Sequence, residues 1–449
     1  MKAFKKLFTK TYRDLFFPLI IEQIFLTLIA NFNVFLFSLF NDQMVAAIGI
    51  SDQVLNIGAM VTNVVILGST ILILQHADRS NTSYSKRVIK ESLLLNISIG
   101  IILVLIFGIF ARDILSLMQT PLELRTSAAT YVRIVSVSIA FLSLSSLSLS
   151  ILRAFGFVSV AVRVSVINTI LIIIGNSIIV LFKVGGIEQI ALATLLARFI
   201  GMCLSINTVR SHIPELSDFF REKFDKDIRK NILGLGIPSA MEGISYNFSQ
   251  TIITAIIASL GTLAVTSKIY TQTITSFIFS IGVAGGVSGQ IIIGHLIRDR
   301  KFEKISSFAR TNANMISLIG ALINLALALG GGFIVRIFTD DPEIINIVTK
   351  LLFLQILLDP SRVANEILVN ELNVLKDVKY SVSIGMLVNY AFVLPASFIV
   401  VNILGLGIKS IWLIFIIDEM LRRVLFDRRI KSKKFMEINE NEWFKETKA

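Results

Sequence analysis

The chain has 449 residues, of which 54% are hydrophobic and only 16% are charged. A soluble domain has about a quarter charged residues, so this sequence has too few polar side chains to cover a water-facing globule. The composition and a mean hydropathy of +0.77 exclude a disordered chain and an ordinary soluble enzyme, and a single cysteine excludes a disulfide scaffold. An integral membrane protein remains, and the net charge of +12 must fit a membrane topology.

Twelve apolar stretches are long enough to cross a bilayer as α-helices, which takes about 20 residues each. The first stretch is much longer than the core of a signal peptide and has no small-residue cleavage site, so we expect it to be part of the mature protein. The expected spans are Phe16–Phe40, Met44–Gln75, Glu91–Phe110, Ala128–Leu152, Ser159–Phe182, Ile187–Ile206, Ile237–Leu260, Leu263–Leu296, Ser306–Ile337, Ile344–Val369, Ser381–Ile403 and Gly407–Phe426.

Lys and Arg residues gather on one side of these spans. About three quarters of the 43 Lys and Arg residues lie before the first span, after every second span and in the C-terminal tail. Because such residues concentrate in cytoplasmic loops, we expect both termini in the cytoplasm and a multi-pass protein of the plasma membrane (the inner membrane of a bacterial cell). Topology then explains the basic excess, and we expect no nucleic-acid partner.

The longest polar connection, Arg210–Lys230, separates two similar halves. Pro18 and Glu22 begin the first span as Pro238 and Glu242 begin the seventh, with the same separation. Six spans per half give both halves the same orientation, as in the parallel repeats of transporters, which handle substrate between the repeats. We therefore expect an N-terminal six-helix lobe over 1–210, a cytoplasmic linker over 211–230, a C-terminal six-helix lobe over 231–426 and a basic cytoplasmic tail over 427–449.

Short motifs follow one another along nearly the whole chain. They are Pro18 to Asn33 with Ala46–Gly49, Ile151–Gly156, Ala191–Thr194, Ile291–His295, Asn365–Asp377 and Ile417–Arg422. In order and spacing they resemble the motifs of the multidrug and toxic compound extrusion (MATE) family, part of a larger superfamily of flippases and exporters. The resemblance implies an all-α fold of twelve transmembrane helices in two pseudo-symmetric lobes around a central cavity. It also implies export of organic, often cationic, compounds driven by inward flow of protons or sodium.

The sequence departs from the family pattern at two positions linked to ion coupling. In one prokaryotic branch, aspartates on the first and fifth helices serve the N-terminal lobe. These positions fall here on Asn33 and on Gly175 or Asn176, none of which is acidic. The resemblance therefore does not carry a proton relay over to those positions.

Polar side chains inside the spans are the candidate functional residues, because an ionisable group near the bilayer centre costs roughly 2.5–3.5 kcal/mol on insertion scales. On the first span, Glu22 and Asn33 share a face; the alternative for Glu22 is an interfacial or packing role. On the seventh, Glu242, Tyr246 and Gln250 form a polar face. A carboxylate in such a place can hold or release a proton. The alternative there is a structural bond that Glu242 shares with Glu22 by symmetry.

The tenth span carries Asp359, Arg362 and Asn365, with Pro360 between the first two. A proline frees backbone carbonyls, and transporters place ion sites at broken helices. The alternative is an Asp359–Arg362 pair, three residues apart, that neutralises itself. A structural ion-pair cluster is expected near the end of the twelfth span, from Asp418, Glu419, Arg422 and Arg423.

These features together predict a secondary active multidrug efflux transporter. It would export small organic compounds, cationic or amphipathic, by H⁺- or Na⁺-coupled antiport with alternating access. We expect ion-coupling or substrate-binding roles for the named residues of the first, seventh and tenth spans, contacts with a small-molecule substrate and with membrane lipid, and function as a monomer. No metal and no cofactor apart from the coupling ion is expected.

Two other functions compete with this hypothesis. The segment Gly286–Gly289 matches the GxSG of rhomboid-type serine proteases, but all three histidines of the chain lie in or beside cytoplasmic loops, away from such a serine. We therefore expect no enzyme. A lipid-linked saccharide flippase of the same superfamily is the serious alternative. Mostly acidic or neutral candidate residues favour a cationic substrate or a coupling cation over a pyrophosphate.

Overall fold

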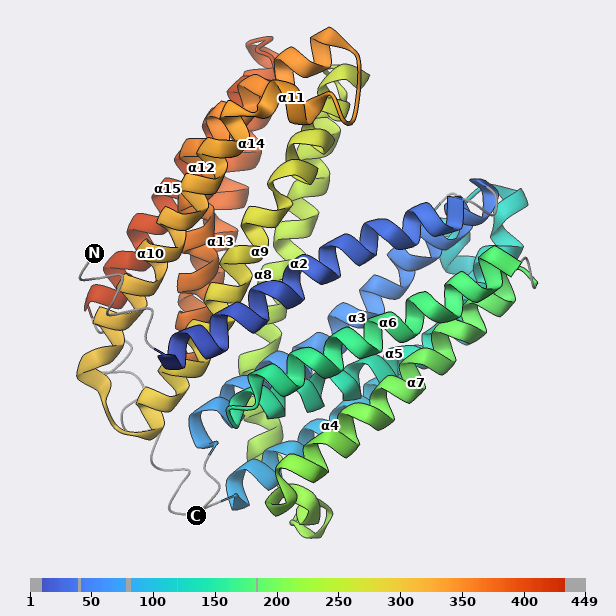
Figure 1. The fold of residues 1–449 in the computed structure, drawn as a ribbon, viewed down its shortest axis with the longest axis vertical. Coiled ribbons are helices and arrows are strands. Elements are labelled where there is room, and N and C mark those ends of the chain that lie inside the picture. Colours follow the sequence, from blue (N-terminus) through green and yellow to red (C-terminus); the bar gives the residue numbers. More distant parts are fainter. Residues whose placement is uncertain (1–9, 39–41, 78–81, 119, 183–184, 433–449) are drawn as a thin grey trace. The chain divides into compact units, whose positions relative to one another are not determined.

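The computed structural model describes the chain apart from residues 1–9, 39–41, 78–81, 119, 183–184 and 433–449, and apart from some side chains between residues 30 and 46. The described residues form helices joined by short connections, with no strand among them (Figure 1). Each of the twelve expected spans has a helical counterpart. The predicted all-α membrane fold is therefore confirmed.

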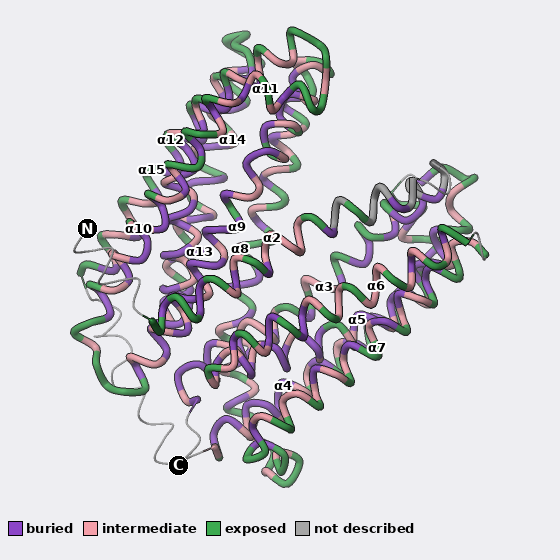
Figure 2. Tube along the Cα trace, viewed as in Figure 1, coloured by how far each residue is buried: buried purple, intermediate pink, exposed green. Residues whose placement is uncertain are grey.

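Residues 24–240 form one compact unit, called here the N-terminal unit. Within it, α5 packs against α3, α4 and α7 around a buried apolar core (Figure 2). Its α5 serines are largely buried, which supports a packing role for small hydroxyl residues. The complete elements of this unit are α3 (Asp42–His76), α4 (Ser83–Leu117), α5 (Leu122–Ala154), α6 (Val158–Phe182), α7 (Ile187–His212) and the 3₁₀ helix η1 (Pro214–Arg221).

Residues 1–23 and 241–449 form the second compact unit, called the C-terminal unit. Its central helix is α12, which packs against α9, α10 and α15. The elements that lie wholly within this unit are α9 (Thr262–Arg298), α10 (Phe302–Leu329), α11 (Gly331–Val335), α12 (Pro342–Val374), α13 (Val378–Val388), the π-helical η2 (Asn389–Val393), α14 (Leu394–Phe398), the π-helical η3 (Ile399–Ile403) and α15 (Ile408–Ser432).

Two helices belong to both units. The first, α2 (Lys10–Ser38), leaves the C-terminal unit after Gln23, and α8 (Lys226–Ala258) leaves the N-terminal unit after Ala240. Both contain an internal proline, Pro18 and Pro238, shortly before the change. The first helices of the two sequence halves, α2 and α8, thus share a proline shortly before the residue at which each passes from one compact unit to the other. The compact units do not begin and end where the expected lobes do, and the division at 210, 230 and 426 stays a prediction.

Two expected spans are interrupted. The ninth divides at Gly330 into α10 and the short α11, and the eleventh consists of α13, η2, α14 and η3. In the eleventh, Pro395 has no N–H to donate, and the amide of Leu394 bonds to the carbonyl of Asn389, five residues back. A proline inside a span therefore coincides with a π-helical turn, a rare form that often marks functional sites.

Local sequence explains several helix ends. After α5 the backbone of Gly156 has φ +89°, a left-handed conformation that glycine adopts without strain, and the amide of Phe157 bonds back to the carbonyl of Leu152 at 2.8 Å. At the start of α12, the side chain of Asp341 accepts a 2.8 Å hydrogen bond from the amide of Glu343. Pro342 follows it at the first helical position, where no N–H is needed.

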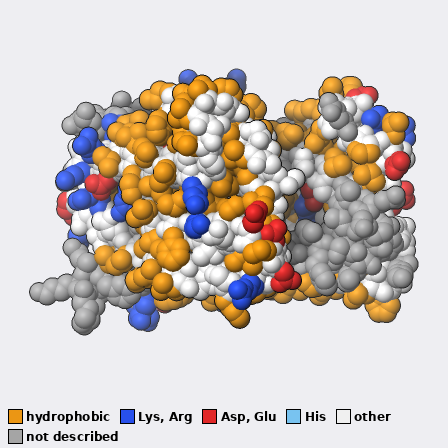
Figure 3. Space-filling view, turned by 90° about the horizontal axis from the view of Figure 1, so that it is seen from above, with side chains coloured by type: hydrophobic (Ala, Val, Ile, Leu, Met, Phe, Trp, Pro, Cys, Tyr) orange, Lys and Arg blue, Asp and Glu red, His pale blue; other side chains and the backbone are white. Residues whose placement is uncertain are grey.

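Among the described residues, nine helices are long and apolar enough to cross a membrane. The charged cluster of the twelfth span interrupts the apolar stretch of α15, which is not one of the nine. Large hydrophobic side chains are exposed on helix surfaces, for example Ile101, Leu105 and Ile109 of α4. Figure 3 shows hydrophobic side chains over much of one face. Such a surface matches lipid rather than water.

Candidate functional site

Three helices of the C-terminal unit bring together a tyrosine, an arginine and a glutamate. Arg362 on α12 donates from Nη2 to the hydroxyl of Tyr246 on α8 at 2.6 Å. Its Nε lies 3.5 Å from Oε1 of Glu419 on α15. Arg362 therefore joins α8, α12 and α15 through one planar guanidinium, which has donors on several edges.

Asn365 completes this arrangement from the same helix as Arg362. Its Nδ2 donates to both the backbone carbonyl and Oε2 of Glu419, each at 2.8 Å. The carboxylate of Glu419 thus has a partner at each oxygen. The sequence placed Glu419 in an ion-pair cluster confined to α15, whereas its salt bridge is with Arg362 of α12.

Asp359 lies one turn before Arg362 and is buried, 3% exposed. Its Oδ2 accepts a 2.7 Å hydrogen bond from Nδ2 of Asn324 on α10, which also donates to the carbonyl of Gln355. Among the described residues, no salt bridge joins Asp359 to Arg362, although Arg362 acts on it electrostatically. The direct contacts of the arginine are with Tyr246 and Glu419, and the self-neutralising pair stays one possibility.

The backbone carbonyl of Pro360 on α12 accepts hydrogen bonds from side chains of two other helices. It accepts from Nη1 of Arg423 at 3.0 Å and from the hydroxyl of Ser317. Arg423 also donates to Asn314 of α10 at 2.7 Å. This arginine therefore binds polar groups of α10 and α12 instead of an acid of its own helix.

Glu242 and Gln250 are half-buried on α8, on either side of Tyr246. Oε1 of Glu242 lies 3.6 Å from the position that a Cβ would take at Gly385 of α13. Glu366 and Arg422 act on the Glu242 carboxylate electrostatically. The structure therefore places Glu242 beside the cluster of α12 and α15, and it gives Gln250 no part in that cluster.

Sequence reasoning missed Glu366, which lies one turn after Arg362 on α12. Its carboxylate accepts a 2.9 Å hydrogen bond from Nδ2 of Asn370. The signal was present, because Asp359, Arg362 and Glu366 follow each other at three- and four-residue spacing and so share one helical face. On α15, Asp418 and Arg422 form a salt bridge, as expected for the charged cluster near the end of the twelfth span. Arg422 also donates to Oδ1 of Asn389 at 3.4 Å.

Two further sequence candidates lie on α2. Glu22 is buried in the part of α2 that belongs to the C-terminal unit. Asn33 lies further along α2, where its side chain is outside the described residues. Lys268 of α9 is also buried, and its ammonium group donates to the hydroxyl of Thr254 on α8. The shared face of Glu22 and Asn33 stays a prediction.

A second buried acid, also missed, lies near the end of α12. Asn312 of α10 donates from Nδ2 to Oε1 of Glu371 at 2.9 Å, and its Oδ1 accepts from the hydroxyl of Tyr12 on α2 at 2.6 Å. All three side chains are fully buried. Gly289 of α9 leaves the space for them, since a Cβ there would lie 2.6 Å from Glu371 Oε1. The glycine-rich segment of α9 is thus a packing face.

Replacing Asn312 with leucine should destabilise the protein strongly. The change leaves the Glu371 carboxyl without its donor and the Tyr12 hydroxyl without its acceptor, and a buried polar group without a partner costs about 1–3 kcal/mol, more if charged. Thermal unfolding in detergent measures the loss. Thr311→Ala on the neighbouring position of α10 is the matched control and should change stability by less than about 0.5 kcal/mol. Equal melting temperatures for Asn312→Leu and the wild type would contradict the role of this network.

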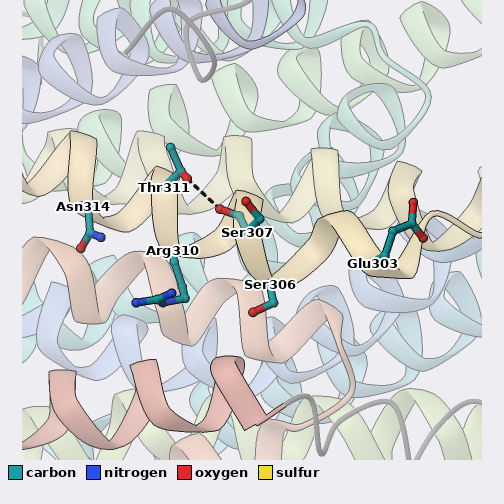
Figure 4. Close-up of a pocket in the computed structure, with 6 residues that line it drawn as sticks. All are labelled: Glu303, Ser306, Ser307, Arg310, Thr311 and Asn314. Atoms are coloured by element: carbon teal, nitrogen blue, oxygen red, sulfur yellow. Dashed lines mark hydrogen bonds between the residues drawn. The ribbon is translucent and has the colours of Figure 1, made fainter. Parts of the chain in front are cut away.

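A separate polar pocket of about 390 Å³ lies along the first turns of α10 (Figure 4). Arg310, in this pocket, bonds to Asp427 of α15 at 2.7 Å, and Asn314 accepts from Arg423. Arg310 and Arg423 are therefore already engaged in contacts between α10 and α15. The pocket is lined by Glu303, Ser306, Ser307, Arg310, Thr311 and Asn314.

Comparison with known proteins identifies the fold and the family. The sequence model of the MatE family matches residues 18–178 and 238–415, which is most of the chain. The chain belongs to the MATE family. The uncharacterized transporter YisQ of Bacillus subtilis is 30% identical over 442 residues, covering 96% of both chains. The probable multidrug resistance protein NorM of Thermotoga maritima is 22% identical over 399 residues, covering 85% of this chain and 83% of NorM.

Solved MATE structures share this architecture. A variant of the MATE transporter VcmN of Vibrio cholerae superposes with a TM-score of 0.86 at 18% identity, covering 97% of this chain and 99% of that one. The resemblance drawn from the sequence motifs is therefore confirmed, as is the MATE fold. This MATE protein is a multi-pass membrane transporter, and Arg362 lies on α12, one of the helices long and apolar enough to span a membrane.

Proposed function

We propose that this MATE transporter exports small organic compounds, cationic or amphipathic, in exchange for H⁺ or Na⁺ that flows inward. The observation that carries the proposal is the pairing of acids in the C-terminal unit. Asp418 is paired with Arg422, and Glu419 with Arg362. Among the described residues, no salt bridge joins the nearby acids Glu242, Asp359 and Glu366 to a Lys or Arg, although Arg362 and Arg422 act on them electrostatically.

Acids without a cationic partner are costly inside a membrane. An ionised carboxylate removed from water needs a paired charge, and transporters use such residues along ion pathways. Asn324 and Asn370 hold Asp359 and Glu366 with amide donors, which orient a carboxylate without cancelling its charge. These acids therefore need a proton or a bound cation for charge balance, which is what a coupling site requires.

The same acids suit a cationic substrate. Cation binding at Glu242 or Asp359 and binding of a positively charged substrate would compete for the same negative charge. A coupling cation that binds one conformation more tightly shifts the population toward it, and alternation between inward and outward access turns this competition into exchange. Relatives named as probable multidrug resistance proteins support an organic substrate. The same proposal places the protein in the plasma membrane with both termini in the cytoplasm, and it expects the protein to work as a monomer.

Transport by the purified protein in liposomes tests the proposal. Ethidium export is measured under an imposed proton gradient, an imposed sodium gradient, or neither. Export that depends on one gradient supports antiport and identifies the coupling ion, whereas export independent of both contradicts it. A labelled lipid-linked saccharide, offered in the same liposomes, tests the flippase alternative: its movement without ethidium transport would replace the exporter by a flippase.

Glu242→Gln should reduce gradient-driven export by at least about tenfold, which corresponds to ~1.4 kcal/mol of lost interaction with the cation. The amide keeps the shape of the side chain but provides no negative charge. Glu343→Gln, at the exposed start of α12, is the matched control and should export normally. Unchanged coupling in Glu242→Gln would exclude this residue from the coupling site and leave Asp359 and Glu366 as the candidates.

A further inference from the structure

An arc of polar side chains runs along the surface of α3 in the N-terminal unit. Asp52, Asn56 and Asn63 are all exposed, and α3 from Ala47 to His76 is apolar enough to cross a membrane. These residues are spaced by four and seven positions, so at about 3.6 residues per turn they lie within roughly 40° of one another. Asn63 lies near the middle of this span. The exposed Gln53 flanks the arc.

Apolar side chains occupy the next sector of the same helix. Ile57 and Val61 are exposed, 56% and 39%, and lie further round the helix than the arc. The exposed surface of α3 therefore has an apolar sector that suits lipid and a polar sector that does not. A charged side chain inside a membrane faces protein or water instead of lipid. Because the arc is exposed rather than packed against protein, water is the environment that its polar side chains require.

Asp52 retains its capacity to bind a partner. Arg198 of α7 acts on it electrostatically, but no salt bridge within 4 Å joins the two among the described residues. The guanidinium of Arg198 is instead held by the hydroxyl of Ser138, at 2.8 Å from Nη1. Tyr131, beside them, is buried. Asp52 is therefore an exposed residue whose carboxylate is influenced by the charge of a nearby arginine that Ser138 holds in place.

We propose that the polar arc of Asp52, Asn56 and Asn63 binds the organic cation that the transporter carries. The Asp52 carboxylate would receive the positive charge, the two amides would contact polar atoms, and the half-buried Met60 between them would provide a polarizable apolar contact. This inference rests on the proposed export of cationic compounds, and it gives the N-terminal unit a binding surface separate from the acids of the C-terminal unit. The family resemblance did not indicate it, because the N-terminal positions that it singled out are neutral here.

Cysteine labelling tests whether the arc faces water and substrate. Replacing the lone Cys203 with alanine gives a thiol-free background. In it, Asn56→Cys and Asn63→Cys are compared with Ile57→Cys and Val61→Cys. A thiol reacts as the thiolate, which needs water. We therefore expect a charged methanethiosulfonate reagent to label the arc positions at least about tenfold faster than the apolar positions, and ethidium to slow that labelling.

Ethidium binding to the purified protein in detergent, without any gradient, supplies the second measurement. Asp52→Asn should weaken binding at least about fivefold, as expected for loss of one charge-assisted contact. Asp113→Asn, at the exposed end of α4, should not. A monodisperse gel-filtration peak shows that each variant is folded.

The outcomes separate this inference from the proposed function. Equal labelling at all four cysteines means that the arc does not face water, and overturns the inference. Fast labelling without protection by ethidium, together with normal binding by Asp52→Asn, overturns substrate binding at the arc while leaving gradient-driven export intact. A wild-type protein that neither binds nor transports ethidium overturns the proposed function, and the inference with it.

Discussion

Replacing Arg362 with leucine is expected to destabilise the transporter by about 3–5 kcal/mol and to abolish gradient-driven export. Removing one partner of a buried ion pair leaves the other charge without compensation, which accounts for a loss of this size. Here the remaining charge is the buried Glu419, which keeps the hydrogen bond from the amide of Asn365 but loses its salt bridge. Tyr246 loses its donor in the same step, so the link between α8, α12 and α15 is broken.

A double variant separates lost stability from lost function. Replacing a buried ion pair by apolar residues of similar size is often neutral for stability. Arg362→Met combined with Glu419→Leu should therefore melt close to the wild type. We still expect weak export, because the fixed positive charge whose field acts on Asp359 is gone. Thermal unfolding in detergent and ethidium export in liposomes measure the two effects. Wild-type export by the double variant would show that the pair serves only to hold the fold.

Gly236→Ala and Gly68→Ala are each expected to prevent normal folding, with a loss of at least about 3 kcal/mol. The two glycines mark a close crossing of α3 and α8 within the N-terminal unit. A Cβ at Gly68 would lie 2.0 Å from the carbonyl oxygen of Ile232, and a Cβ at Gly236 would lie 2.0 Å from that of Val64. Both obstacles are backbone atoms of rigid helices, which do not move aside as the end of a side chain does. Small residues at such crossings let helices approach closely.

Gly234 provides the matched control on the same helix. A Cβ at Gly234 meets nothing within 4 Å. Gly234→Ala should therefore leave the fold intact, and it raises helix propensity by about 1 kcal/mol. The yield of monodisperse protein and its melting temperature compare the three variants. Because Gly68 and Gly236 share one contact, their double variant should lose less than the sum of the two single losses. Equal yields for Gly234→Ala and Gly236→Ala would contradict the close crossing.

The location of each helix in the chain, and the residues that share one of its faces, were largely predictable from the sequence. Apolar runs of membrane-spanning length located the helical segments of the chain, because a backbone in lipid has to satisfy its own hydrogen bonds as a helix. Spacing along α12 placed Asp359, Arg362 and Asn365 near one another, as the structure shows. The ordered motifs identified the family. Each of these conclusions depends on residues that are close in the chain or on composition over a window of residues.

Contacts between helices were not predictable in the same way. The sequence paired Asp359 with Arg362 as one possibility, whereas Arg362 binds Tyr246 and Glu419 from two other helices. It did not indicate Glu371, whose partner Asn312 is 59 residues away. Asp52 was missed although polar Ser51 and Gln53 flank it in the sequence, and its exposure on α3 is what distinguishes it in the structure. Helical period defines a face but leaves open what that face meets.

Composition and charge, from which the first conclusions came, determined by themselves that this is a membrane-spanning helical protein, and the ordered motifs pointed to the MATE family. Hydropathy and loop charge act on each segment separately, so they are readable without a fold. The tertiary structure decided which acids have an arginine partner and which do not. That distinction depends on distances of a few ångströms between side chains on different helices, because electrostatic pairing and hydrogen bonding fall off steeply with separation.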